Sequence, residues 1–309
     1  MDFPWREAAG GSRVIMTDGA STLHENDIVV EAWNTVLFDK FERFKHLLVA
    51  GLAGHSDELL SRGLFRPGDR VLDVGCGFGD STIKIAQLVG PDGEAVGVDC
   101  AQRFIQTGEH DAAEAGVVNA KFFVADVQDD DLRGPYDAAF ARFGTMFFMS
   151  PVPALRNIRK VLKTGGRFAQ IVWRKREDNP WLHDAELRVR AIVPVVSHED
   201  TDAVHCGPGP FSMSGADMVS TMMKVAGFDN VAFERFDTGI CIGRDLEEAV
   251  EFAIALGPAG EIIRLAGADG ERLIPEVATA LRESLARYAR SDGVWAPSST
   301  WFITARNPG

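Results

Sequence analysis

Apolar residues recur at helical spacing in the first part of the chain, between residues 27 and 60. Trp33, Leu37 and Phe41 follow one another at intervals of four, and further leucines continue the pattern. This spacing predicts amphipathic helices that come before the main sheet. We therefore expect an N-terminal helical cap over residues 1–60.

From residue 70 the pattern changes to short apolar runs separated by helical stretches. Each run has the length of a buried strand, and the glycine- or proline-containing turns between them mark where the helices end. This alternation predicts an α/β protein with a Rossmann-like, doubly wound sheet of seven strands. The strands are expected at 71–74, 95–98, 121–125, 135–143, 168–173, 231–242 and 300–305, with helical insertions at 177–211 and 246–290.

The first strand leads directly into a glycine-rich turn, in the stretch RVLDVGCGFGD. Gly75, Gly77 and Gly79 stand just before a predicted helix. Glycine permits positive φ and close approach of the backbone to a ligand, and a helix N-terminus offers free N–H groups. A nucleotide-like cofactor is expected there. The dinucleotide fingerprint would need a third glycine where this chain has Asp80.

Acidic residues stand at the ends of the next two predicted strands. Asp99 lies 20 positions after Gly79, where a carboxylate can accept hydrogen bonds from both hydroxyls of a ribose. The alternative is that Asp99 only caps the following helix. Asp126 follows the third strand in the segment Ala125-Asp126-Val127.

Together these motifs resemble those of the class I S-adenosylmethionine (SAM) dependent methyltransferases. The resemblance rests on the strand aspartate before G-x-G-x-G, on the Ala-Asp-Val segment and on a turn similar to L-K-P-G-G, in which Thr164 replaces proline. Three further segments resemble those of a subgroup of small-molecule methyltransferases related to the ubiquinone and menaquinone biosynthesis type. They are Trp173-Arg174, Asn179-Pro180-Trp181 and Gly209-Pro210-Phe211. The resemblance implies that the last strand is antiparallel.

The resemblance also implies roles for individual residues in binding SAM. The expected contacts run from the methionine end, through the ribose, to the adenine, and the Arg142 backbone would lie near the α-amino group. The residues implied are Asp73, Gly75, Gly77, Gly79, Asp99, Cys100, Asp126, Val127 and Arg142.

Aromatic residues near the predicted strand ends are candidates for an acceptor pocket, although each could instead belong to the core. An apolar pocket suits a small aromatic or quinone-like acceptor. The histidines show no metal-ligand spacing, so no metal is expected, and His183 and His24 are the candidate bases. An acceptor that ionises readily would need no base. The expected pocket residues are Trp33, Phe147, Trp173, Trp181 and Phe211.

Composition and net charge exclude some classes of binding partner. The chain has 309 residues, 46% of them hydrophobic, a net charge of −13 and a pI near 5.0, which argues against a nucleic-acid partner. The four cysteines form no C-x-x-C pair, and no run approaches the about 20 apolar residues of a membrane span. We expect a cytoplasmic enzyme with a small-molecule methyl acceptor, and a homodimer is one of the oligomeric states that stay open.

The expected organisation is a cap over residues 1–60, a SAM-binding core over 61–176, and a third part over 177–309. This last part would hold the lid insertion, the rest of the sheet and the helical insertion. Two other functions stay open from sequence alone: a non-catalytic SAM-binding protein and an NAD-dependent oxidoreductase.

Overall fold

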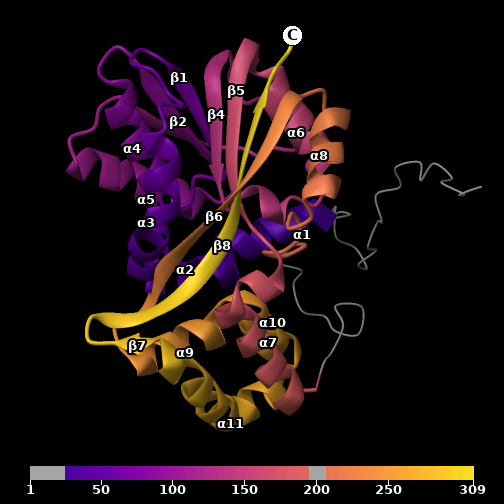
Figure 1. Ribbon diagram of the computed structural model, residues 1–309. Helices are drawn as coiled ribbons and strands as arrows, with labels where there is room; N and C mark the ends of the chain where they lie inside the picture. The colour runs from indigo at the N-terminus through magenta and orange to yellow at the C-terminus, as the bar shows by residue number, and fades with distance from the viewer. Residues whose placement is uncertain (1–24, 195–206) are drawn as a thin grey trace, which may run out of the picture.

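The computed structural model describes residues 25–194 and 207–309. A central sheet forms the upper part of the molecule in Figure 1, and helices cover its two faces. A second group of helices lies at the other end, where two long strands reach down to it. The helices are α1 (Glu25–Ala32), α2 (Phe38–Arg43), α3 (Lys45–Ser61), α4 (Asp80–Val89), α5 (Gln102–Glu114), α6 (Pro151–Lys160), α7 (Pro180–Ile192), α8 (Ala216–Val225), α9 (Leu246–Ala255), α10 (Gly257–Leu265) and α11 (Gly267–Leu285).

The sheet has the strand order β3-β2-β1-β4-β5-β8-β6, with a short β7 paired to β8. Strands β1 to β5 pair in parallel, and β8 runs antiparallel to both β5 and β6. The predicted fold class, a doubly wound sheet with its last strand antiparallel, is therefore confirmed. The two-residue β7 is an addition. The strands are β1 (Arg70–Val74), β2 (Glu94–Asp99), β3 (Ala120–Val124), β4 (Tyr136–Arg142), β5 (Leu162–Trp173), β6 (Asp229–Gly243), β7 (Ala289–Arg290) and β8 (Gly293–Arg306).

The central strands are apolar because helices cover both of their faces. Val71, Leu72 and Val74 of β1 are fully buried, and Phe140 of β4 is buried beside them. A parallel sheet with two covered faces needs such continuous apolar strands. At its carboxyl edge the order reverses between β1 and β4, since the chain continues from β1 to β2 on one side and reaches β4 on the other. Ligands of open α/β sheets bind at this reversal.

The two insertions build the opposite end of the molecule. Helix α7 follows β5, and α9 to α11 lie between β6 and β8; in Figure 1 these helices gather below the sheet. Residues 195–206 of the predicted lid lie outside the described residues. The division of the chain into three parts stays a prediction.

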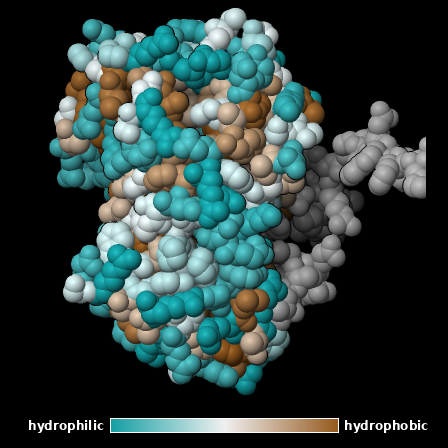
Figure 2. Space-filling view, viewed as in Figure 1, coloured by the Kyte–Doolittle hydropathy of each residue, from teal (hydrophilic) through white to brown (hydrophobic). Residues whose placement is uncertain are grey.

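The surface in Figure 2 is mainly hydrophilic, and its hydrophobic residues form separate small groups. No helix within residues 25–194 and 207–309 combines the length and apolar character needed to cross a membrane. The expected homodimer and cytoplasmic location stay predictions.

Gly79 allows the start of α4 to pack closely against Phe122 and Gly108. Its φ is +78°, and a Cβ there would lie 2.6 Å from the Phe122 ring and 3.0 Å from the Gly108 Cα. Gly116, just after α5, has φ +67°, but a Cβ there would meet nothing within 4 Å. Both positions favour glycine, and only Gly79 also lacks space.

We therefore expect Gly79→Ala to destabilise the protein more than Gly116→Ala does. Backbone strain should cost about 1 kcal/mol in each variant, and the clash should add about 1–3 kcal/mol in Gly79→Ala alone. Chemical denaturation without ligand measures both. Equal losses of unfolding free energy would contradict the packing role of Gly79.

Candidate active site

A cavity of about 870 Å³ opens at the carboxyl ends of β1, β2 and β4 and continues to the helices of the two insertions. Its volume lies in the range of small-molecule sites. One end is lined by the glycine turn after β1, and the other by residues of α7, α9 and α10. The cavity therefore joins the two places where the sequence predicts a cofactor and an acceptor.

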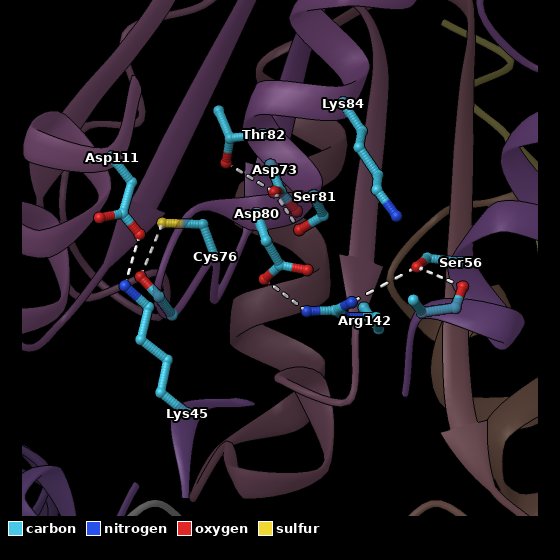
Figure 3. Close-up of polar contacts among 12 residues, drawn as sticks. Lys45, Ser56, Asp73, Cys76, Asp80, Ser81, Thr82, Lys84, Asp111 and Arg142 are labelled. Carbon is cyan, nitrogen blue, oxygen red and sulfur yellow. Dashed lines mark hydrogen bonds and ion pairs between the residues drawn. The ribbon is translucent and has the colours of Figure 1, made fainter. Parts of the chain in front are cut away.

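The glycine turn is fixed by Asp73, which is buried at the end of β1 (Figure 3). One carboxylate oxygen of Asp73 accepts hydrogen bonds from the hydroxyls of Ser81 and Thr82, each at 2.7 Å. Burial raises the pKa of Asp73 to about 6, although the two hydroxyls lower it. Asp73 does not line the cavity. It ties the strand to the first turn of α4 across the glycines.

Two loops meet beside this turn. A Cβ on Gly75 would lie 3.1 Å from the Cα of Gly144, which follows β4, so the two backbones touch where the strand order reverses. Gly77 has φ +53° and open space beside its Cα, and both Gly75 and Gly77 line the cavity. A ligand can therefore lie directly against this part of the backbone.

Asp99 stands at the end of β2 with its carboxylate held by backbone donors. It accepts from the N–H of Gly77 and from the N–H of Ala101, each at 3.0 Å. Burial raises the pKa of Asp99, and the backbone donors oppose the shift. Each oxygen keeps further acceptor capacity, because a carboxylate offers about four lone-pair sites. The alternative role as a helix cap stays a prediction, since Ala101 is itself the N-cap residue of α5 and no side chain forms a cap hydrogen bond there.

Asp126 lines the cavity farther along the same edge and is contacted from α1. The Asn26 amide donates to one oxygen of Asp126, and the Gln128 amide donates to the other at 3.2 Å. Gln128 also donates to the Asn26 carbonyl oxygen at 2.6 Å. Neither Asn26 nor Gln128 was expected from the sequence, because the hydrogen bond from Asn26 to Asp126 joins residues 100 positions apart.

Arg142 and Asp80 form an ion pair at the centre of the site. The Arg142 guanidinium donates to Asp80 at 2.7 Å and to the Ser56 hydroxyl at 3.3 Å (Figure 3). The side chains are 10% and 15% exposed, and both line the cavity. The second oxygen of Asp80 is buried and has no hydrogen-bond partner among the described residues. Asp80, which breaks the dinucleotide fingerprint, is thus a partner for a side chain on β4.

Aromatic rings cover the wall between the two ends of the cavity. The Trp33 and Phe147 rings pack edge to face with centroids 5.0 Å apart, and Trp173 stacks on Phe143 at 4.3 Å. The five residues expected to line an acceptor pocket all line this cavity: Trp33, Phe147, Trp173, Trp181 and Phe211.

The other predicted residues divide between the cavity and its surroundings. Cys100 and Val127 line the cavity, as do Asp99, Asp126 and Arg142, whereas Gly79 does not. His183 lies on α7 but not among the lining residues, and His24 lies outside the described residues. Roles for all of these residues in binding or catalysis stay predictions.

No histidine or tyrosine lines the cavity within the described ranges. The fully buried His55 of α3 lies nearby, with its ring 5.7 Å from that of Trp173. Burial lowers the pKa of His55 to about 4, so this ring is neutral near pH 7. Its Nε2 lies 3.0 Å from the Ser298 hydroxyl, which makes it a link between α3 and β8.

Comparisons with known proteins agree with this geometry. A family model described as "Methyltransferase domain" matches residues 65–192. The ubiquinone/menaquinone biosynthesis C-methyltransferase UbiE of Ectopseudomonas mendocina is 31% identical over 184 residues, which are 57% of this chain and 71% of that protein. The chain belongs to the class I SAM-dependent methyltransferases.

Other members of this methyltransferase family differ in acceptor. The nocamycin O-methyltransferase of Saccharothrix syringae is 30% identical over 176 residues, which are 54% of this chain and 61% of that protein. The crystal structure of YcgJ from Bacillus subtilis shares the fold, with a TM-score of 0.53 at 18% identity over 83% of this chain and 99% of that one. The chain is therefore a methyltransferase, and these relatives do not favour an NAD-dependent oxidoreductase.

The raised pKa of Asp73 predicts a dependence of stability on pH. The folded pKa of about 6 exceeds the unfolded value near 3.9, so the folded state binds more protons between these values. This contribution is present at low pH and is lost as the pH rises through 6. For the wild type it falls by about 2 kcal/mol between pH 4.5 and pH 8.

In Asp73→Asn this contribution is absent. The unfolding free energy of the variant relative to the wild type should therefore rise by about 2 kcal/mol over the same pH interval. Urea denaturation at several pH values measures the difference. A difference that stays constant with pH would refute a raised pKa at Asp73.

Proposed function

We propose that this methyltransferase binds SAM against the glycine turn and transfers its methyl group to a small acceptor with an apolar or aromatic body. One observation carries this proposal: a single cavity of about 870 Å³ joins the glycine turn to the wall of tryptophan and phenylalanine rings. Two small molecules can lie in one continuous space of this size. The methyl group would cross from one to the other without exposure to bulk water.

The residues at the cofactor end fit SAM. Asp99 offers free acceptor sites for the ribose hydroxyls, because the Gly77 and Ala101 N–H groups use only part of its capacity. The open space beside Gly77 leaves room for a ligand against the backbone. Asp126 and Val127 line the part of the cavity expected to hold the adenine.

The ion pair of Arg142 and Asp80 fits the zwitterionic amino acid end of SAM. A guanidinium binds a carboxylate well, and the unpartnered oxygen of Asp80 can accept from an ammonium group. Both side chains are mostly buried, so added charge would find few competing waters. We therefore assign both side chains to cofactor binding, which adds the Arg142 guanidinium to the backbone contact expected from the sequence.

Bound SAM supplies an electrophilic methyl group, and transfer is an in-line displacement that depends on alignment. The bond from the acceptor to the methyl carbon forms as the bond from sulfur breaks, which leaves S-adenosylhomocysteine. The aromatic wall holds the acceptor in place and excludes water. Because the described lining residues include no histidine or tyrosine, an acceptor that has already lost its proton before it enters the cavity suits this site best.

Two variants and two ligands test the cofactor site. S-adenosylhomocysteine has the nucleoside and the amino acid end, whereas 5′-methylthioadenosine has only the nucleoside. Asp99→Asn should weaken both ligands about tenfold or more, since hydrogen bonds to a charged group contribute about 1.5–3 kcal/mol. Arg142→Gln should weaken S-adenosylhomocysteine by a similar factor and leave 5′-methylthioadenosine unchanged.

Calorimetric titration measures each affinity, and Asp92→Asn, an exposed change near Asp99 in sequence and outside the cavity lining, is the control. Failure of the wild type to bind S-adenosylhomocysteine would refute the proposed function. Equal weakening of both ligands by Arg142→Gln would remove Arg142 from the amino acid end.

A further inference from the structure

Two arginines and a buried glutamate lie at the acceptor end of the cavity. Arg176, Glu186 and Arg190 all line it, together with the aromatic residues of the wall. We propose that Arg176 and Arg190 bind a carboxylate on the methyl acceptor, so that the acceptor is an apolar molecule with an acidic group. This inference rests on the proposed function and specifies its substrate class.

Glu186 holds the two arginines in place. Its side chain is 6% exposed, and both of its oxygens are occupied. Arg190 donates to one oxygen through Nε at 3.0 Å and Nη2 at 2.8 Å, and Arg176 donates to the other through Nη1. A buried carboxylate requires such partners, because an unpaired charge in this position would be costly.

The cluster has more positive charge and more donors than Glu186 needs. Two guanidinium groups face one carboxylate, which leaves a net charge of +1 in a chain whose total is −13. Each guanidinium has five N–H donors, and within the described residues Arg176 uses one of its nitrogens and Arg190 two. The remaining donors are available to a second carboxylate.

Other charges near the cluster offset one another. Lys175 and Glu177 line the cavity with opposite charges, and both are exposed. Glu261, from α10, is paired with Arg264 at 2.8 Å. The surplus positive charge at this end therefore comes from Arg176 and Arg190.

The cluster is continuous with the apolar wall. Leu182, Glu186 and Arg190 follow one another at intervals of four on α7, so they lie along one face of the helix, and all three line the cavity. The Arg176 guanidinium lies over the Phe211 ring, 5.0 Å from its centroid. An acceptor that places its ring against the wall would meet the guanidinium groups with its acidic end.

A matched pair of probes tests the preference for an acid. 2-Naphthoate and 2-naphthamide have nearly the same size and shape, and only the first is charged at pH 7.5. With S-adenosylhomocysteine at saturating concentration, we expect the wild type to bind 2-naphthoate at least tenfold more tightly than 2-naphthamide. Ligand-observed NMR titration gives both dissociation constants.

Single variants of the cluster assign the preference to individual residues. Arg176→Gln and Arg190→Gln should each weaken 2-naphthoate five- to tenfold and leave 2-naphthamide unchanged. Glu186→Gln should have the opposite effect and tighten 2-naphthoate, because it removes the competing carboxylate. Arg188→Gln is the control, since Arg188 is exposed on α7 and does not line the cavity.

Equal binding of the two probes, no binding of 2-naphthoate, or an unchanged acid preference in both arginine variants would overturn this inference. The affinity for S-adenosylhomocysteine, measured separately, should stay the same in all four variants. Loss of that affinity in the wild type would refute the proposed function instead, so the two failures are distinguishable.

Discussion

The site depends on the hydrogen bonds from Ser81 and Thr82 to the Asp73 carboxylate. A turn with glycines at three alternate positions has little conformational preference of its own, so something must fix it between β1 and α4. A buried carboxylate that accepts two hydroxyl donors does so from inside the sheet. Because the turn touches Gly144 after β4 and donates to Asp99 after β2, the same constraint places all three strand ends.

Charged side chains in the cavity form ion pairs, and each of these pairs leaves some hydrogen-bond donors or acceptors unused. Counting only partners among residues 25–194 and 207–309, Asp80 keeps one oxygen unpartnered beside Arg142, and the two arginines around Glu186 keep unused donors. In each pair a guanidinium matches the carboxylate before any ligand binds, so no buried charge is left alone. Each also offers a ligand a group that is already oriented, which lowers the entropy lost on binding.

Local patterns predicted the strands, the glycine turn and five aromatic residues that line the cavity. Alternating apolar runs and glycine turns are short-range signals, and the carboxyl ends of parallel strands lie at one edge, so Asp99 and Asp126 could be placed from sequence. The partners across the fold could not be placed in this way. Asn26 meets Asp126 from 100 positions away, and the Arg142 side chain finds Asp80 only because β1 and β4 are neighbours. No sequence pattern indicated that Glu186 would be buried in the cavity, because its burial depends on how α7 packs.

The two insertions and the cofactor turn come from separate stretches of the sequence. Helix α7 follows β5, and α9 to α11 fill the connection between β6 and β8, so both stretches begin and end on strands of the same sheet. The cofactor turn and its supporting residues lie earlier in the sequence. Two contiguous segments can therefore be exchanged between relatives at these junctions, and such chimeric proteins would replace Trp181 and the charged cluster around Glu186 while they keep Trp33, Phe147 and Trp173.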